Sequence, residues 1–246
     1  MLPEMIFMQE YAARFVEDFG EVFRDIRKAI KGTLEKPVAS PDYEYVAGVD
    51  WGKSGDYTVV TILDQKGHLV AFDQMYKQSY KFMSERVARL LNDYKARALV
   101  ETTGMGDPIF EMLQREYHNV TGFDMTATRK GDIIENLAIM IERGAKGNDN
   151  GVTYPEIPEL LLQLQAFGMK QRDTGTIKYS APKGFHDDFV ISLALAAWQL
   201  RKGAIELGYE FFDPADMLRE EHKKSEIEHP PPRSEMPGWI PPSNIV

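Results

Sequence analysis

The stretch Tyr45–Thr61, YVAGVDWGKSGDYTVVT, most constrains the fold of this chain of 246 residues. Its apolar first part predicts a buried strand that ends on a carboxylate, Asp50. Gly52 and Gly55 then predict a turn, and a second, β-branched strand follows over 58–63. Because a strand alternates its faces, the sheet beneath would point an acid at the end of the strand into a cleft. The alternative is a turn aspartate that binds its own backbone.

The residues that follow predict a mixed α/β domain. A hairpin signal, Asp64-Gln-Lys-Gly67, leads to a third strand over 68–76 and completes a three-strand antiparallel meander. Ser79 then caps a predicted helix that runs to about Tyr94, and a short strand over 97–101 again ends on a carboxylate. Later predicted elements are a helix from Asp107-Pro108, a weak strand at 120–125, helices at 130–143 and 159–167, a β-hairpin at 169–172 and 176–179, and a helix at 187–202.

Both ends of the chain differ from this central part. Residues 8–31 have the apolar spacing of one amphipathic helix, which Gly32 and Pro37 would end. Beyond about residue 208 the composition is polar and proline-rich, which predicts a mostly disordered tail. We therefore expect an N-terminal helical linker segment (1–36), a central domain (37–207) and a C-terminal tail (208–246).

Composition limits the kinds of site and partner. The chain has no cysteine, five histidines, and 38 acidic against 29 basic residues, for a net charge of −9. The lack of cysteine fits a reducing cytoplasm and excludes thiolate metal sites, and the many carboxylates favour hard ions such as Mg²⁺ or Mn²⁺. Residues 203–246 alone hold nine acids and four bases, so the negative net charge does not exclude DNA as a partner. No apolar run approaches the ~20 residues of a membrane span, and we expect no membrane partner.

Acidic residues stand at three predicted element ends: Asp50, Glu101, and the pair Asp187 and Asp188 at the start of the last core helix. If the first and fourth strands are neighbours, Asp50 and Glu101 project from adjacent strand ends. A helix packed across those strands would add its own carboxylates. Crowded carboxylates repel one another unless cations lie between them. Two divalent ions about 3.5–4 Å apart relieve this repulsion and also hydrolyse phosphodiesters. We therefore expect these four residues to be the catalytic metal ligands.

Each position also has a structural interpretation. Asp187 and Asp188 could merely complement the N-terminus of a helix. Glu101 could cap the segment that follows, or pair with Arg97 or Arg129. Taken together, the three positions are better explained by metal binding.

Three motifs appear in order: GVDWGKSGDYTVV (48–60), VETTGMGDP (100–108) and SAPKGFHDDFVISLALA (180–196). With the order of strands and helices, they resemble the ribonuclease-H-like nuclease fold. The closer resemblance is to the nuclease domain of the large terminase subunit of tailed bacteriophages. QEYAARFVEDFGEVF (9–23) is similar to the segment that joins that family's ATPase domain to its nuclease domain. The resemblance covers roughly residues 9–202.

This resemblance implies a mixed sheet flanked by helices and a metal-dependent endonuclease. Such an enzyme would cut concatemeric phage DNA when packaging starts and ends, with little sequence specificity, in the host cytoplasm. Asp50 would bridge two Mg²⁺ or Mn²⁺ ions, Glu101 would bind one of them, and Asp187 or Asp188 would complete the site. The implied partners are double-stranded DNA, the terminase ATPase domain, the small terminase subunit and the portal.

The ATPase part of that family is not found here. The segment Gly48–Ser54 is the nearest match to a phosphate loop. It has three residues between its glycines where the motif needs four, and it precedes a strand rather than a helix. We expect a nuclease fragment or a stand-alone nuclease.

Basic residues near the predicted hairpin and helices are candidates for contacts with DNA phosphates. They are Arg129, Lys130, Lys170, Arg172, Lys178 and Lys183. Each is equally explained as a solvated surface side chain. His186, beside the acids, could move a proton or bind metal, but a loop histidine is more often structural, and we leave it out of the predicted site.

Three other functions compete with this prediction. An actin-like ATPase also runs strand, Asp-x-Gly, turn, strand, but it needs a second glycine-rich phosphate loop, and no Asp-x-Gly-Gly occurs later in the chain. A Holliday-junction resolvase or transposase keeps the fold and cuts a different DNA. An inactive interaction module for packaging proteins would show no metal-dependent cutting.

Overall fold

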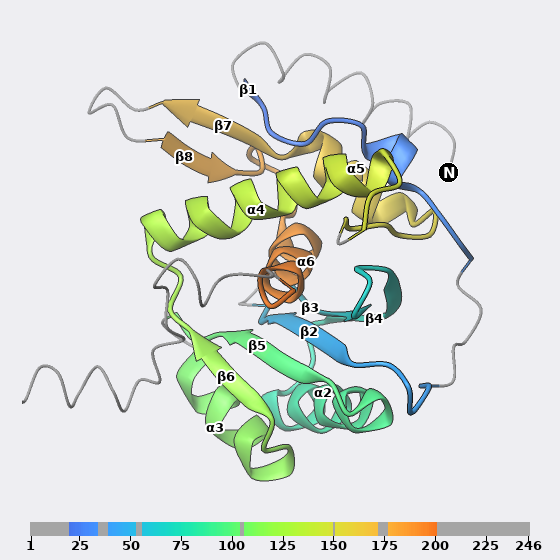
Figure 1. Ribbon diagram of the computed structural model, residues 1–246. Coiled ribbons are helices and arrows are strands. Elements are labelled where there is room, and N and C mark those ends of the chain that lie inside the picture. Colours follow the sequence, from blue (N-terminus) through green and yellow to red (C-terminus); the bar gives the residue numbers. More distant parts are fainter. Residues whose placement is uncertain are drawn as a thin grey trace, which may run out of the picture. The chain divides into compact units, whose positions relative to one another are not determined.

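A five-stranded mixed sheet forms the centre of the computed structural model, which describes residues 20–33, 39–52, 56–103, 106–149, 151–171 and 177–200 (Figure 1). The sheet order is β4-β3-β2-β5-β6. The predicted meander is confirmed, because β2, β3 and β4 pair in antiparallel fashion, while β5 and β6 run parallel to β2. The strands are β2 (Tyr45–Asp50), β3 (Tyr57–Asp64), β4 (Leu69–Tyr76), β5 (Arg97–Glu101) and β6 (Val120–Phe123).

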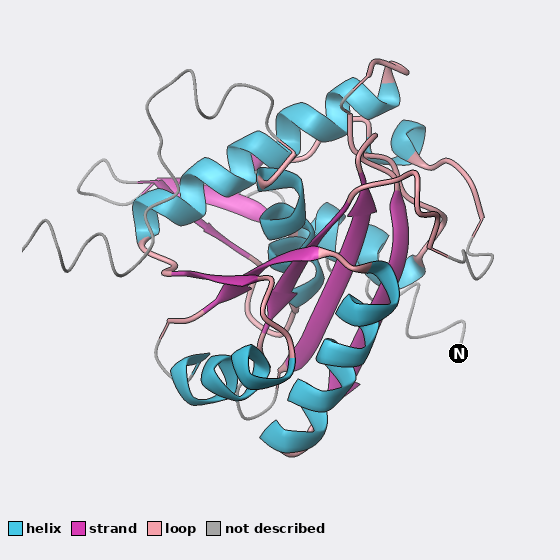
Figure 2. Cartoon of the chain, turned by 60° about the horizontal axis from the view of Figure 1, so that its bottom comes forward, coloured by secondary structure: helices cyan, strands magenta, loops and turns pink. Residues whose placement is uncertain are grey.

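Helices α2 (Tyr80–Tyr94) and α3 (Gly106–Glu116) cover one face of this sheet (Figure 2). Val87 and Leu91 of α2 pack with Ile109 and Leu113 of α3 in a core layer that includes the inward residues of β2 and β5. The predicted cap of α2 is confirmed, since Ser79 Oγ accepts a hydrogen bond from the Phe82 amide at 3.3 Å.

The other face is covered by α6 (Asp188–Trp198), which lies between the sheet and α4 (Ala127–Ala145) in Figure 1. All residues of α6 from Asp188 to Ala197 are buried. A helix that is apolar on every side needs partners on every side. Besides the sheet and α4, a short helix, α5 (Pro158–Ala166), also contacts α6.

Gly48 allows α6 to lie directly on β2. A Cβ atom added at Gly48 would lie only 1.9 Å from the carbonyl oxygen of Ser192 in α6. Ser192 Oγ donates a hydrogen bond to the Gly48 carbonyl oxygen at 2.9 Å and lies 3.0 Å from Thr61 Oγ1 of β3. Near the other end of the helix, Gln199 Nε2 donates to the Ala47 carbonyl oxygen at 2.7 Å. These contacts set how closely α6 approaches β2 and where α6 lies along its own axis.

A small second sheet has the order β1-β7-β8, with β1 at Gly20–Glu21, and lies across α4 from the five-stranded sheet (Figure 1). The predicted hairpin is confirmed for its two strands, β7 (Gly168–Gln171) and β8 (Ile177–Ser180). Its turn, and all residues beyond 200, lie outside the described residues.

The single helix predicted over 8–31 is wrong for its described part; residues 8–19 lie outside the described residues. Residues 20 and 21 form β1 (Gly20–Glu21), which pairs with β7, and a 3₁₀ helix, η1 (Ile26–Ala29), follows. Gly20 weakens a helix at this point, and the edge of β7 offers backbone partners instead. Phe23, Ile26 and Ala29 are buried in the core. Part of the segment predicted as a linker therefore belongs to the packed domain.

Among the described residues, no helix has the length and apolar character needed to cross a lipid bilayer.

Replacing Gly48 by alanine should strongly destabilise the fold. The added Cβ would meet backbone atoms of α6, which cannot move away as the end of a flexible side chain can. We expect Gly48→Ala to lower the free energy of unfolding by about 3 kcal/mol or more, measured by urea unfolding.

Gly131, buried inside α4, provides the matched control. A Cβ there would lie 3.4 Å from Tyr179 Cε2, which is an ordinary contact. Gly131→Ala should leave stability unchanged or raise it by up to about 1 kcal/mol, because alanine is the better helix former. Equal effects of the two substitutions would contradict the role given to Gly48.

Candidate metal centre

Side chains from several separate parts of the chain line one pocket at the carboxyl ends of β2 and β5. The pocket has a volume of about 170 Å³. Its lining residues are Asp50, Trp51, Asp56, Glu101, Met125, Lys130, Asp187, Asp188 and Ile191. All four acidic residues selected from the sequence are in this lining.

Asp50 and Glu101 meet because β2 and β5 are parallel neighbours. Val49 lies opposite Val100 in the register, so each strand continues directly into its acid. Asp50 is only 8% exposed, and Glu101 lines the pocket beside it. Burial raises the pKa of Asp50 well above its ordinary value, and the charges of Glu101 and Asp188 raise it further. Two carboxyl groups in this position need a proton or a cation between them.

The first turn of α6 places Asp187 and Asp188 at the same pocket. Asp187 occupies the N-cap position but makes no capping hydrogen bond with its side chain. The amide of Phe189 is instead satisfied by Gln163 Oε1 of α5, at 2.8 Å. Gln163 thus takes over a capping function that the sequence suggested for the aspartates.

Asp188 is the more buried of the two, at 7% exposure. Its Oδ2 atom is buried and accepts no hydrogen bond from the described residues. Burial raises the pKa of Asp188 to about 6, with a further contribution from Asp56, while the neighbouring His186 opposes this rise. His186 Nδ1 lies 3.4 Å from that Oδ2 atom. A buried carboxylate oxygen that accepts no hydrogen bond from the described residues can bind a cation.

Asp187 has a different partner. Lys130 of α4 donates a hydrogen bond from Nζ to Asp187 Oδ2 at 3.1 Å, and both side chains are partly buried. The two adjacent acids, which the sequence could not distinguish, are therefore in different electrostatic environments. Asp187 is paired with a cation of the chain itself, whereas Asp188 faces the other carboxylates.

The remaining predicted residues are spread over the α4 side of the molecule. Arg129 lies over the Phe123 ring, 4.0 Å from the centroid. Lys170 and Lys178 are opposite each other in the β7–β8 ladder, and Lys183 is exposed in the turn before α6. Arg172 lies outside the described residues.

The arginines suggested as alternative partners of Glu101 have other contacts. Arg97 donates to the carbonyl oxygen of Gln199 at 3.4 Å, and Arg129 contacts Phe123. The position of Glu101 at the pocket therefore does not depend on an ion pair with either arginine.

Two residues outside the predicted site, Asp56 and His186, also lie here. Oxygen and nitrogen atoms of Asp56, His186 and Asp188 all lie within 4.8 Å of one another, a spacing that could hold a metal ion. Asp56 stands one residue before β3, and β3 runs antiparallel to β2. The start of β3 therefore lies at the same sheet edge as Asp50, which is the signal that could have identified Asp56.

The donor set fits a hard divalent cation. It consists of carboxylate oxygens with one imidazole nearby, and it includes a buried oxygen that has no hydrogen-bond partner in the described part of the chain. A larger pocket, of about 460 Å³, lies at the opposite end of β2, but its charged residues are of both signs: Glu44, Asp93, Lys95 and Arg97. We place the chemistry in the smaller pocket, because five acidic residues converge there with a single lysine, Lys130.

Comparison with known proteins identifies the family. The large terminase subunit of Thermus virus P23-45 is 31% identical over 238 residues, which cover 93% of this chain and 46% of that protein. The corresponding subunit of Thermus phage G20c is 30% identical over the same shares. The chain thus spans about half the length of the curated relatives it matches. No protein-family model matches the chain.

Solved structures that resemble this chain are also large terminase nucleases. The large terminase nuclease of thermophilic phage G20c with bound magnesium has a TM-score of 0.65 and 30% identity, covering 73% of this chain and 97% of that one. The nuclease domain of the large terminase subunit of bacterial virus Sf6 has a TM-score of 0.57 at 9% identity, covering 74% and 98%, and it supports the fold alone. The predicted ribonuclease-H-like fold is confirmed.

Since its central part covers nearly the whole of a solved large terminase nuclease at 30% identity, this chain belongs to the phage large terminase nuclease family.

Proposed function

We propose that this chain is a divalent-metal-dependent endonuclease that cuts concatemeric viral DNA during genome packaging, with little sequence specificity. One observation gives the main support: Asp50, Glu101, Asp187 and Asp188, from distant parts of the sequence, line a single pocket. The family supports the same function, since a related nuclease at about 30% identity has been solved with bound magnesium and with bound cobalt.

Two Mg²⁺ or Mn²⁺ ions are the proposed cofactors. Bound metal ions of this kind generate a nucleophilic water and stabilise the leaving oxygen in phosphodiester hydrolysis. Asp50 is the central ligand of the proposal, since it is buried between Glu101 and Asp188 and its pKa is raised by both. Glu101 and Asp188 would supply further carboxylate oxygens to the ions.

Asp188, rather than Asp187, is the proposed ligand from α6. Asp188 Oδ2 is buried and accepts no hydrogen bond from the described residues, with the His186 imidazole nearby, whereas Asp187 is neutralised by Lys130. In this proposal Lys130 holds Asp187 and α4 against the start of α6, and the pair keeps the two helices in position at the pocket.

Double-stranded DNA is the proposed substrate. Lys178 and Lys170 on the hairpin, Lys183 before α6, and Arg129 are the proposed phosphate contacts, with Arg172 beyond the described part of β7. The net charge of −9 gives the chain little long-range attraction for DNA, so binding should be weak and sensitive to salt. The proposed partners that hold the DNA in place are the terminase ATPase domain, the small terminase subunit and the portal, in the host cytoplasm.

The competing functions have less support. If the chain were an actin-like ATPase, a junction resolvase or an inactive module, we would expect it to have other relatives or a different site. The relatives and solved structures reported above are large terminases. The division into a linker segment (1–36), a nuclease domain (37–207) and a tail (208–246) stays a prediction, although Phe23 and Ile26 pack in the core.

Asp50→Asn should abolish cutting without unfolding the chain. The substitution removes the central ligand. Changing a residue that only supports a metal ligand typically lowers activity by roughly 10–100-fold, and the loss here should be larger. It also removes a buried, repelled charge, so the metal-free variant should unfold at a higher temperature than the wild type. Plasmid digestion with Mg²⁺ or Mn²⁺, with and without chelator, and thermal unfolding measure these effects.

Asp64→Asn is the matched control, because Asp64 is also a buried aspartate at a strand end. It lies at the opposite end of the sheet, where its Oδ1 accepts hydrogen bonds from the amides of Lys66 and His68. An asparagine keeps that acceptor, so cutting should persist. Undiminished cutting by Asp50→Asn would refute the proposed metal site.

Asp188→Asn and Asp187→Asn should differ in two measurements. Asp188→Asn should lose cutting and the rise in unfolding temperature on adding Mg²⁺, whereas Asp187→Asn should keep the rise.

The second measurement is the pH dependence of folding stability in the presence of chelator. The folded pKa of Asp188, about 6, exceeds its ordinary value of 3.8, so the folded chain binds more protons between these values. Its stability should therefore fall as pH rises from about 4 to 6, by up to about 3 kcal/mol from this group.

Asp188→Asn should remove that part of the pH dependence, and Asp187→Asn should leave it in place. The reverse assignment in both measurements would show that Asp187 is the ligand and that its ion pair with Lys130 opens.

Charge reversal at Lys178 should weaken cutting without affecting the metal site. Lys178→Glu removes one proposed phosphate contact, so the slope of log affinity against log salt should fall by about 0.9 on duplex DNA. Lys66→Glu changes an exposed lysine in the β3–β4 turn by the same charge and should leave the slope unchanged. Equal effects of the two variants would indicate a general effect of net charge.

A further inference from the structure

Three aromatic rings lead away from the metal pocket along the ends of β3 and β4. The His186 ring, next to Asp188, packs edge-on against Tyr57, with centroids 5.1 Å apart and an interplanar angle of 85°. The rings of Tyr57 and Tyr76 follow, with centroids 4.8 Å apart at 34°. Lys77 Nζ lies 4.8 Å from the centroid of Tyr76. We name His186, Tyr57, Tyr76 and Lys77 the aromatic track.

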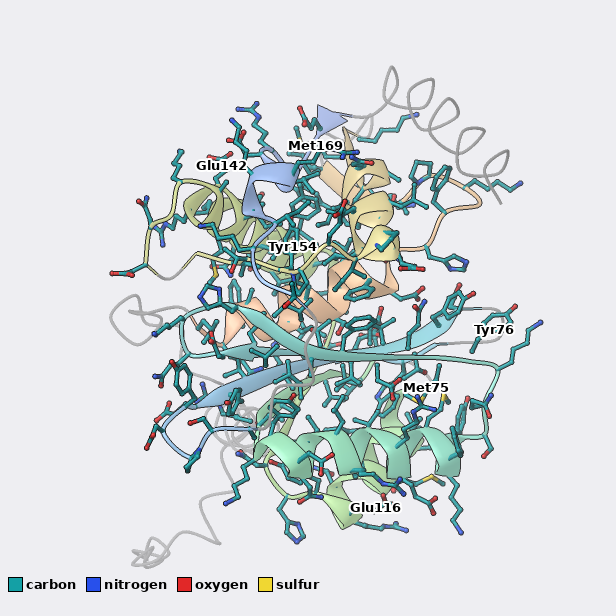
Figure 3. The ribbon with its side chains drawn as sticks, turned by 90° about the vertical axis from the view of Figure 1, so that its right-hand side faces the viewer. Met75, Tyr76, Glu116, Glu142, Tyr154 and Met169 are labelled. Carbon is teal, nitrogen blue, oxygen red and sulfur yellow. The ribbon has the colours of Figure 1, made fainter. Side chains whose placement is uncertain are left out.

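The sheet register builds this track. Tyr57 and Tyr76 are opposite each other in the β3–β4 ladder, at the sheet edge where β2 ends. Figure 3 shows Met75 on the α2 side of the sheet and Tyr76 on the other side. This agrees with the alternation of a strand, since Met75 is buried with α2 while Tyr76 is 41% exposed.

Lys77 reaches Tyr76 through an uncommon backbone conformation. Its φ angle is 50°, in the left-handed region that residues other than glycine seldom adopt. Such conformations are costly and cluster at binding and catalytic sites. Lys77 forms no ion pair with the described residues, whereas Arg86 of α2 is paired with Asp73. Lys77 is therefore available to a phosphate.

An exposed aromatic ring beside an ammonium group matches the chemistry of single-stranded nucleic acid. Bases inside a duplex are stacked on one another, so a protein ring can stack only on a base that has left the duplex. The contact between an exposed lysine and a ring is weak. A DNA phosphate can therefore form an ion pair with Lys77 in place of this contact, which exposes the Tyr76 ring.

We propose that the aromatic track binds the DNA strand next to the scissile phosphate, with an unpaired base stacked on Tyr76 and a backbone phosphate on Lys77. This proposal rests on the nuclease function, because the track begins at His186, beside the pocket. It adds a preference: the chain binds locally opened DNA more tightly than fully paired DNA.

The test compares two labelled DNAs of equal length, one fully paired and one with unpaired arms. Fluorescence anisotropy gives their affinities for the chain in the Asp50→Asn background, which prevents cutting, with Mg²⁺ present. Tyr76→Leu keeps an apolar side chain against Tyr57 but removes the ring. It should weaken binding to the DNA with unpaired arms by about 5-fold or more and binding to paired DNA by less than about 2-fold. Tyr76→Phe should restore the affinity.

Lys77→Gln provides a second variant at an exposed position, where folding is not at risk. It should weaken binding to both DNAs and lower the salt slope by about 0.9 on the paired DNA. The matched controls are Tyr43→Leu and Lys66→Gln, because Lys66 Nζ lies 5.4 Å from the Tyr43 ring at the opposite end of the meander. Neither control should change the affinity for either DNA.

The proposal is overturned if Tyr76→Leu has no effect, acts equally on both DNAs, or acts no more strongly than Tyr43→Leu. Plasmid cutting by the wild type separates this result from the nuclease function. If the wild type cuts plasmid but Tyr76→Leu does not weaken DNA binding, the nuclease function stands and the role proposed for the aromatic track is wrong. A chain that neither binds nor cuts DNA refutes both.

Discussion

The contact between α6 and β2 at Gly48 is the constraint on which the rest of the structure depends. With no side chain at Gly48, the backbone of α6 lies directly on the strand. The hydrogen bonds of Ser192 to Gly48 and of Gln199 to Ala47 then fix the helix along its axis. A helix displaced by one residue would rotate by about 100° and rise 1.5 Å, which would turn Asp188 away from Asp50. The geometry of the pocket is therefore set by buried contacts several residues away from it.

The pocket itself opposes folding in the absence of cations. Burial and mutual repulsion raise the pKa values of Asp50 and Asp188, so each ionised carboxylate destabilises the folded chain. The surrounding structure compensates in part. Gln163 satisfies the Phe189 amide, and Lys130 neutralises Asp187. Such an arrangement is typical of a binding site, because the energy stored in the crowded carboxylates is released when a cation binds.

The mixed direction of the strands explains why distant residues meet at one edge of the sheet. β2 and β5 end there, so they supply Asp50 and Glu101. β3 begins there and β4 ends there, so they supply Asp56, Tyr57 and Tyr76 to the same edge. The acids and the aromatic track are therefore neighbours, although their sequence positions differ widely. A purely parallel sheet would have put the start of β3 at the other end.

The sequence by itself determined the elements and the chemical type of the site. Runs of apolar and β-branched residues between turn signals located the meander, and acids at the ends of apolar strands indicated a metal centre at Asp50 and Glu101, because these are local properties of the chain. It did not determine residues 20–30, where pairing with β7 and burial of Phe23 replaced the predicted helix. It also could not separate Asp187 from Asp188, or find Asp56. Which of two adjacent acids is paired, and which loop residue reaches the pocket, depends on α4, α5 and β3, and only the tertiary structure brings these elements together.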